Sequence, residues 1–208
     1  RTTSSSQMSK YQGSGGRRVP GRQCEDKNVT EMIDPFGRHV SYLRISVTDR
    51  CDFRCHYCMS EDMTFLPKTD VLSLEELDRL CSAFVRKGVK KLRITGGEPL
   101  LSPKFGELLK GIMGLGLQDV SLTTNGQLLP RHADDIIESK MKRINVSLDT
   151  LNRDAFRDIA RSGDLNTVLH GIELMQAGGL KVKINMVPMR GVNDDQIIPL
   201  LEYSLERG

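Results

Sequence analysis

The chain has 208 residues, a net charge of +3 and ordinary apolar, charged and glycine contents, which is the composition of one globular domain with a core. This charge is too small to indicate nucleic-acid binding, and no run of about 18 apolar residues is present that could span a membrane. The sequence therefore predicts neither a nucleic-acid partner nor a membrane segment.

Residues 1–31 are rich in Ser, Gly, Arg and Gln and contain no acidic residue before Glu25. We expect a disordered tail here, and a targeting segment or an upstream linker are both left open. A transit peptide would place the protein in mitochondria, and otherwise we expect it in the cytoplasm. The chain begins with Arg1 and ends at Gly208 within an expected helix, so a fragment of a longer protein is expected.

From about residue 40, short alternating apolar runs are followed by helical patterns. The predicted strands are Tyr42–Val47, Lys91–Thr95, Val120–Thr123, Arg143–Leu148 and Lys181–Val187. The clearest helix is 74–87, with a capping box from Ser73 to Glu76 and Gly88 at its end. Cys81 lies on its apolar face and is predicted to be a core residue. A last helix is predicted to start near Asn193, with Gln196 at its third position.

Each predicted strand has one apolar and one polar face. A doubly wound sheet needs two apolar faces, and a closed eight-stranded barrel has an apolar centre. The α/β pattern therefore predicts a partial, open (β/α) barrel with helices outside and a polar lumen. Arg44, Arg93, Lys183 and Arg143 would line that lumen, so we expect an anionic ligand. In the alternative, some of them pair with Asp149 or lie outside the barrel.

Five cysteines are present, an odd number, and three of them are clustered, which favours a metal or redox site in a reducing compartment over disulfides. Cys51, Cys55 and Cys58 form a C-x3-C-x2-C motif after the first strand. Three thiolates can each bind one iron of a cubane cluster and leave the fourth iron open. Arg50 and Arg54 are expected to favour the thiolate forms. A zinc site or three structural cysteines are the alternatives.

The C-x3-C-x-aromatic-C motif resembles the signature of the radical S-adenosylmethionine (SAM) superfamily. Gly96-Gly97-Glu98-Pro99, directly after the second strand, resembles its GGE motif. Thr48-Asp49-Arg50-Cys51, Thr123-Thr124-Asn125-Gly126 and Asn145–Leu151 further resemble the GTP 3′,8-cyclase family of molybdenum cofactor biosynthesis. The resemblance runs from about Met32 to the end, and it implies a barrel of six units, of which about five are present here.

The resemblance also implies roles for individual residues. Cys51, Cys55 and Cys58 would ligate a [4Fe–4S] cluster. Tyr57, Gly97 and Ser147 would contact SAM, and Arg44, Arg93, Thr123 and Lys183 would contact GTP. No further side chain is expected to act in catalysis beyond the cluster and SAM.

The implied reaction is radical chemistry carried by the cofactors. The reduced cluster cleaves SAM to a 5′-deoxyadenosyl radical, which removes hydrogen from the ribose C3′ of GTP, and the carbon radical closes a ring onto guanine C8. The implied product is (8S)-3′,8-cyclo-7,8-dihydroguanosine 5′-triphosphate. The implied partners are a reductant of the flavodoxin or ferredoxin type and a downstream cyclic pyranopterin monophosphate synthase, and a homodimer is left open.

One departure from the family pattern matters. The family carries a second C-x2-C…C cluster and a Gly-Gly pair near its C-terminus, and this sequence has neither. We therefore expect residues 32–208 to form an incomplete barrel that binds a cluster but does not cyclise GTP. Another radical SAM enzyme, acting on a peptide or a tRNA, and a non-enzymatic iron–sulfur or zinc sensor remain the alternatives.

Overall fold

The computed structural model describes residues 32–207, apart from the side chain of Lys68. The tail predicted over residues 1–31 lies outside the described residues. Five parallel strands form one sheet in the order β1-β2-β3-β4-β5. Their bounds are β1 Tyr42–Ser46, β2 Lys91–Thr95, β3 Asp119–Thr124, β4 Arg143–Ser147 and β5 Lys181–Asn185. All five strands were predicted, and their ends differ from the predicted ends by at most two residues.

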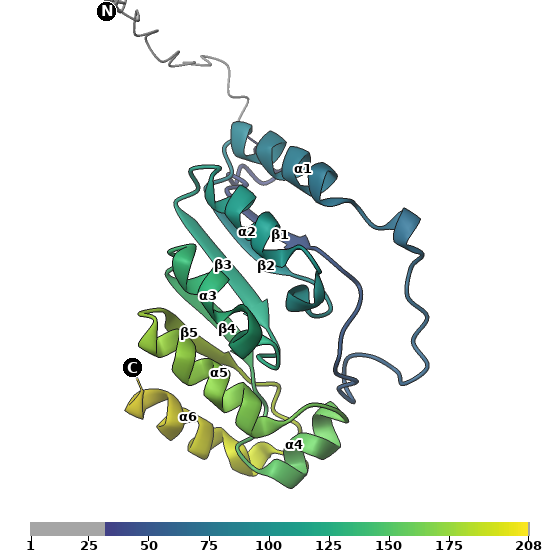
Figure 1. Ribbon diagram of the computed structural model, residues 1–208, viewed down its shortest axis with the longest axis vertical. Helices are drawn as coiled ribbons and strands as arrows, with labels where there is room; N and C mark the ends of the chain where they lie inside the picture. Colours follow the sequence, from purple (N-terminus) through teal and green to yellow (C-terminus); the bar gives the residue numbers. More distant parts are fainter. Residues whose placement is uncertain (1–31, 208) are drawn as a thin grey trace, which may run out of the picture.

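Helices connect the strands. They are α1 Leu74–Arg86, α2 Phe105–Met113, α3 Ala133–Glu138, α4 Arg153–Ala160, α5 Leu165–Ala177 and α6 Ile197–Glu206, with short 3-10 turns at Lys68–Asp70, Pro99–Leu101, Leu129–His132 and Asp194–Gln196. Figure 1 shows α1, α2, α3, α5 and α6 following one another along the sheet, and neighbouring helices pack in chain order. Within residues 32–207, no helix is both long and apolar enough to cross a bilayer.

The strand order identifies the architecture. A doubly wound sheet reverses its strand order at a switch point, whereas here each strand adds beside the one before it. Such sequential addition under one layer of helices is the arrangement of a barrel, and β1 and β5 remain as open edges among the described strands. The predicted α/β partial barrel is confirmed.

The two faces of the sheet differ as the alternation predicts. The apolar side chains point to the helices and are nearly inaccessible, with Leu92 at 1% exposure and Ile94, Leu122 and Ile144 at 0%. Cys81 joins this core from α1 at 0% exposure, which confirms its predicted place. The polar side chains of the same strands occupy the face without helices.

Local signals at helix ends are partly confirmed. Ser73 caps α1 in a capping box with Glu76, and Gly88 follows the helix with a φ of +97°. The last helix was predicted to start near Asn193, but only a 3-10 turn starts there, and α6 begins at Ile197. The reason is that the side chain of Asn193 donates to the carbonyls of Asp149 and Val187 instead of capping a helix.

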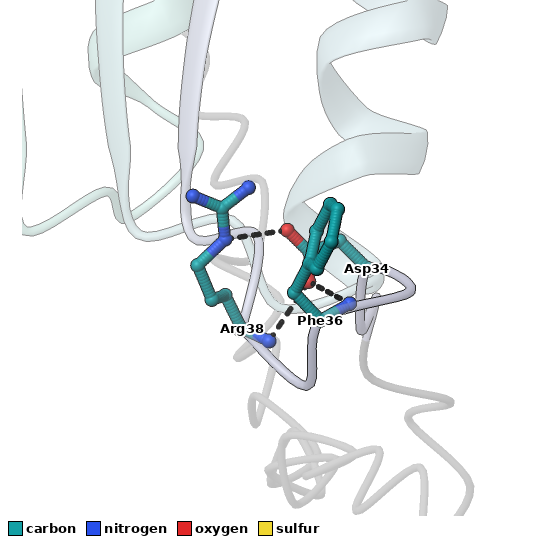
Figure 2. A network of polar contacts seen from close by, with 3 residues as sticks. All are labelled: Asp34, Phe36 and Arg38. Carbon is teal, nitrogen blue, oxygen red and sulfur yellow. Dashed lines mark hydrogen bonds and ion pairs between the residues drawn. The ribbon is translucent and has the colours of Figure 1, made fainter.

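A tight turn precedes β1. The carboxylate of Asp34 accepts hydrogen bonds from the main-chain N–H groups of Phe36 and Arg38 and from Arg38 Nε, at 2.9, 3.0 and 2.6 Å (Figure 2). Gly37 supplies the positive φ of +78° that closes the turn. An antiparallel bridge from Ile33 to His39 completes it, so the chain is folded before it enters the sheet.

Candidate functional site

The carboxyl ends of the five strands carry the predicted site. The long segment from Val47 to Ser73, between β1 and α1, contains the three clustered cysteines and forms the large loop in Figure 1. We call residues 50–58 the cluster loop. In it Cys51 and Cys55 are half-buried and Cys58 is exposed, and the N–H of Cys58 donates to the carbonyl of Cys55 at 2.9 Å. The C-terminal position after a barrel strand is where such folds place their chemistry.

The protonation of these thiols differs from the sequence prediction. Burial raises the pKa of Cys55 to about 11, with Asp149 adding to the shift, and burial also raises the pKa of Cys51. Arg54 directs its guanidinium to the carbonyls of Cys51 and Phe53, at 2.7 and 2.8 Å, rather than to a thiol. Burial therefore opposes the thiolate forms expected for Cys51 and Cys55, and metal binding has to displace the protons of these two thiols.

The cluster loop is hydrogen-bonded to the C-terminal end of α4. The N–H groups of Arg54 and His56 donate to the carbonyls of Ala160 and Ile159, at 3.0 and 3.1 Å, which are the last residues of that helix. Phe53 packs edge to face on Phe156 with ring centroids 5.8 Å apart. A short helix between β4 and α5 thus positions a loop that lies about a hundred residues earlier in the chain.

The side chains of the described residues do not form a binding site for a single metal ion. Among residues 32–207, no group of three or more His, Cys, Asp or Glu side chains is arranged to hold one metal ion. A cubane distributes its cysteines over separate iron atoms, so its ligands need not converge on one point. The donor set itself, three cysteines on one loop, fits such a cluster.

The loop Gly96–Pro99 after β2 lies directly against the cluster loop. The N–H of Gly97 donates to Thr48 O and the N–H of Glu98 donates to Arg50 O, both at 2.7 Å. A Cβ on Gly97 would lie 2.3 Å from Arg50 O. The structure shows that glycine allows close approach of the cluster loop; the close approach of a ligand to this loop stays a prediction.

The carboxylate of Glu98 has 0% exposure. It accepts hydrogen bonds from Leu100 N at 3.0 Å, from Thr124 Oγ1 at 2.8 Å and from Asn125 N at 2.7 Å. Burial raises the pKa of Glu98 to about 7, while these three donors oppose the rise. Because the side chain is enclosed, only the main chain of this loop remains to meet a ligand.

Tyr57 and Ser147, two of the residues predicted to contact SAM, line the same cavity of about 30 Å³ together with Cys55 and Asp149. The hydroxyl of Tyr57 donates to Asp149 Oδ2 at 2.7 Å, and Asp149 Oδ1 accepts from Val187 N at 2.8 Å. Burial first, and then the bond to Asp149, raise the pKa of Tyr57. The third predicted SAM contact, Gly97, packs on the carbonyl of Arg50.

The strand register gathers the predicted GTP contacts on the polar face. One row across the sheet consists of Arg44, Arg93, Ser121, Arg143 and Lys181. The next row towards the carboxyl ends contains Thr123, Asn145 and Lys183. All four predicted GTP contacts therefore lie in two adjacent rows, about 7 Å apart.

These polar groups are largely without partners. Arg143 and Asn145 are exceptions: Arg143 pairs with Asp119 at 2.5 Å, where the partner considered from the sequence was Asp149, and Asn145 Nδ2 donates to Leu122 O at 3.1 Å. Arg93 Nε, Thr123 Oγ1 and Ser121 Oγ are buried and make no hydrogen bond, and the Arg93 guanidinium lies 5.8 Å from the Tyr42 ring. Arg44 and Lys183 are exposed and form no ion pair within residues 32–207.

Several contributors to the site escape sequence reasoning. The link from Asp149 to Tyr57, the packing of α4 on the cluster loop, and the bond from Asn125 Nδ2 to Asp52 Oδ1 at 2.6 Å all join distant segments. The available signals were position, since Asp149 directly follows a predicted strand and Asn125 lies two residues after another, and the motifs in which both residues occur.

Comparison with known proteins agrees with this geometry. The family model of the radical SAM superfamily matches residues 45–204. A GTP 3′,8-cyclase of Rhizobium etli is 56% identical over 180 residues, 85% of this chain and 52% of its own length, and one of Nitrobacter winogradskyi is 54% identical over 188 residues, 88% and 55%. The chain thus spans about half the length of the curated relatives it matches.

The fold is also found in solved structures. A crystal structure of Streptococcus suis SuiB bound to its precursor peptide SuiA superposes with a TM-score of 0.70 at 23% identity, over 80% of this chain and 37% of that chain. With the family model and the three-cysteine loop, the likeness leads to one conclusion. The chain belongs to the radical SAM superfamily, whose members use a [4Fe–4S] cluster and SAM as cofactors.

Proposed function

We propose that the chain is the barrel portion of a GTP 3′,8-cyclase. The observation that carries this proposal is the pair of polar-face rows, in which Arg93 Nε and Thr123 Oγ1 are buried without partners beside Arg44 and Lys183, which form no ion pair within the described residues. Buried donors without partners are costly, so an anionic ligand with acceptor oxygens satisfies them. A nucleoside triphosphate has that chemistry, and relatives bearing the cyclase name support this choice.

In this proposal Cys51, Cys55 and Cys58 hold the cluster by three of its irons. When bound, the cluster and SAM supply one-electron reduction and abstraction of a hydrogen atom. The chain's own residues hold the reactants. Tyr57, Gly97 and Ser147 would position SAM over the open end of the barrel, and the surrounding loops would limit the access of water.

On the polar face, Arg44, Arg93 and Lys183 would neutralise the triphosphate, and Thr123 would donate its hydroxyl. Guanidinium groups suit phosphate oxygens because several N–H donors lie in one plane. Holding the triphosphate on two fixed rows restrains the ribose near the carboxyl ends of the strands. The strand register therefore sets the distance between the substrate and the SAM site.

This chain spans about half the length of the cyclase relatives. A second cluster and the guanine site would lie in the half of the relatives that the chain does not span, so residues 32–208 alone should not cyclise GTP. A flavodoxin- or ferredoxin-type reductant and a downstream cyclic pyranopterin monophosphate synthase are the proposed partners. Reduced thiols and bacterial relatives favour the cytoplasm.

Anaerobic reconstitution with iron and sulfide tests the proposal. The chain should take up close to one cubane, bleach with dithionite and release 5′-deoxyadenosine from SAM. Alanine at Cys51, Cys55 or Cys58 should abolish both cluster and cleavage, because each residue holds one iron. Iron and sulfide analysis and chromatography of the products measure the two outcomes.

Cys81→Ala is the matched control. Its thiol is enclosed in the core, so the variant should keep its iron and lose only about 1 kcal/mol of folding free energy. Uptake of zinc without colour would contradict the proposed cofactor. A cyclised GTP product from this chain alone would contradict the proposal that residues 32–208 do not cyclise GTP by themselves.

A further inference from the structure

A partly buried polar connection joins the loops that follow β1, β2 and β3. Asn125, directly after β3, donates its side-chain amide to Asp52 in the cluster loop at 2.6 Å. Its main-chain N–H donates to Glu98 in the Gly96–Pro99 loop at 2.7 Å. One residue therefore bridges two carboxylates that belong to two different loops.

Glu98 and Asp52 both make further contacts. Glu98 also accepts from Leu100 N and Thr124 Oγ1, and its own N–H donates to Arg50 O at 2.7 Å. The carbonyl of Asp52 accepts from Ser162 Oγ at 2.6 Å, in the segment after α4. The cluster loop is thus hydrogen-bonded to three other segments: the Gly96–Pro99 loop, Asn125 after β3 and Ser162 after α4.

The chemistry of position 125 requires asparagine. Its Nδ2 donates to Asp52, and its Oδ1 accepts from Gln127 N at 3.0 Å, so the side chain uses a donor and an acceptor at once. Aspartate could not donate and would add a third carboxylate between Asp52 and Glu98. Alanine would leave the Asp52 carboxylate without its donor.

Asp52 occupies the gap between Cys51 and Cys55, so a constraint on Asp52 is a constraint on the spacing of two cysteines. The backbone of the Gly96–Pro99 loop is equally constrained, because a Cβ on Gly96 would lie 2.7 Å from Thr48 O. The shape of the cluster loop is therefore tied to that of the neighbouring loop.

We propose that Asn125 is a positioning residue that locks the cluster loop to the Gly96–Pro99 loop through Asp52 and Glu98, and so couples SAM binding to the geometry of the cluster. This inference rests on the proposed ligand set of three cysteines. Asn125 itself contacts neither iron nor substrate in this assignment. Its effect is transmitted by Asp52.

The first test uses the metal-free chain and does not depend on the cluster. Hydrogen exchange should be at least about fivefold faster in residues 51–58 of Asn125→Ala, with α1 and α2 unchanged. Asn166→Ala is the matched control, because Asn166 is an exposed asparagine of α5 whose side chain accepts from Arg153, away from the cluster loop. It should leave exchange in the cluster loop as in the parent.

The second test uses the reconstituted chain. The reduced cluster should give an electron paramagnetic resonance spectrum that changes on adding SAM, and Asn125→Ala should need about tenfold more SAM for that change, equivalent to about 1.4 kcal/mol. Asp52→Ala should have a similar effect. The double variant should be no worse than either single variant, because both remove the same bond.

The outcomes separate this inference from the proposed function. Unchanged exchange in Asn125→Ala, or effects of the two single variants that simply add, would overturn the role of Asn125. A parent chain that forms no cluster would overturn the proposed function, while faster loop exchange in the variant would still establish the positioning role.

Discussion

The two faces of the sheet are built from alternate residues of the same five strands. They differ in whether their side chains are fully packed or leave polar atoms without a hydrogen bond. On the helix-covered face, Ile94, Leu122 and Ile144 have 0% exposure. On the open face, Arg93 Nε and Thr123 Oγ1 are enclosed without a hydrogen bond. The helix-covered face therefore stabilises the fold, whereas the open face keeps polar groups that are able to bind a ligand.

The largest expected effect would come from truncating the covered face. Ile144→Ala should lower the free energy of unfolding by about 3 kcal/mol, because the lost methyl groups leave a cavity in a close-packed core. Lys183→Ala, on the open face, should change it by less than about 0.5 kcal/mol. Urea unfolding of the chain measures both, and equal losses for the two variants would break the comparison.

Neutralising the open face should affect binding more than stability. Arg93→Met keeps the apolar stem and removes the charge, so the dissociation constant for GTP should rise about tenfold, or about 1.4 kcal/mol. Titration calorimetry with GTP tests this, and guanosine, which lacks the phosphates, is the control ligand. A variant that binds GTP like the parent, or that loses stability as Ile144→Ala does, would show that Arg93 serves the fold.

The smallest effect concerns Arg143, the cation of the open face that pairs with Asp119. Hydrogen bonding to Arg143 holds the pKa of Asp119 below its usual value of 3.8. Because the folded pKa lies below the unfolded one, this pair stabilises the fold above about pH 4 and loses that effect as the pH falls further.

Asp119→Asn should therefore cost about 1 kcal/mol or less at pH 7, and this cost should shrink towards pH 3. Urea titrations of parent and variant at both pH values measure it. A cost that does not vary with pH would mean that packing, rather than charge, accounts for the effect of Asp119.

Much of this division was predictable from alternation. Leu43 and Ile45 against Arg44 in one strand, and Ile184 against Lys183 in another, are local patterns of period two that do not depend on the rest of the fold. The same holds for the capping box from Ser73 to Glu76, whose partners are three residues apart. Contacts between residues a few positions apart can therefore be predicted from the local sequence alone.

The partners of the site residues were not predictable in this way. Arg143 pairs with Asp119 because the strand register brings them together. The hydroxyl of Tyr57 donates to Asp149, which lies 92 residues later in the chain. The thiols of Cys51 and Cys55 were expected to be acidic from the neighbouring arginines in the sequence. Their pKa values are raised instead, because burial depends on the packing around them.

The sequence by itself determined the strands, their two faces, the three-cysteine loop and the family, since each is written in residues that are close together in the chain. Only the tertiary structure decided which polar groups of residues 32–207 have a hydrogen-bond partner and which have none. The physical reason is that a hydrogen bond or a buried charge is fixed by distances between loops that meet only once the sheet has formed.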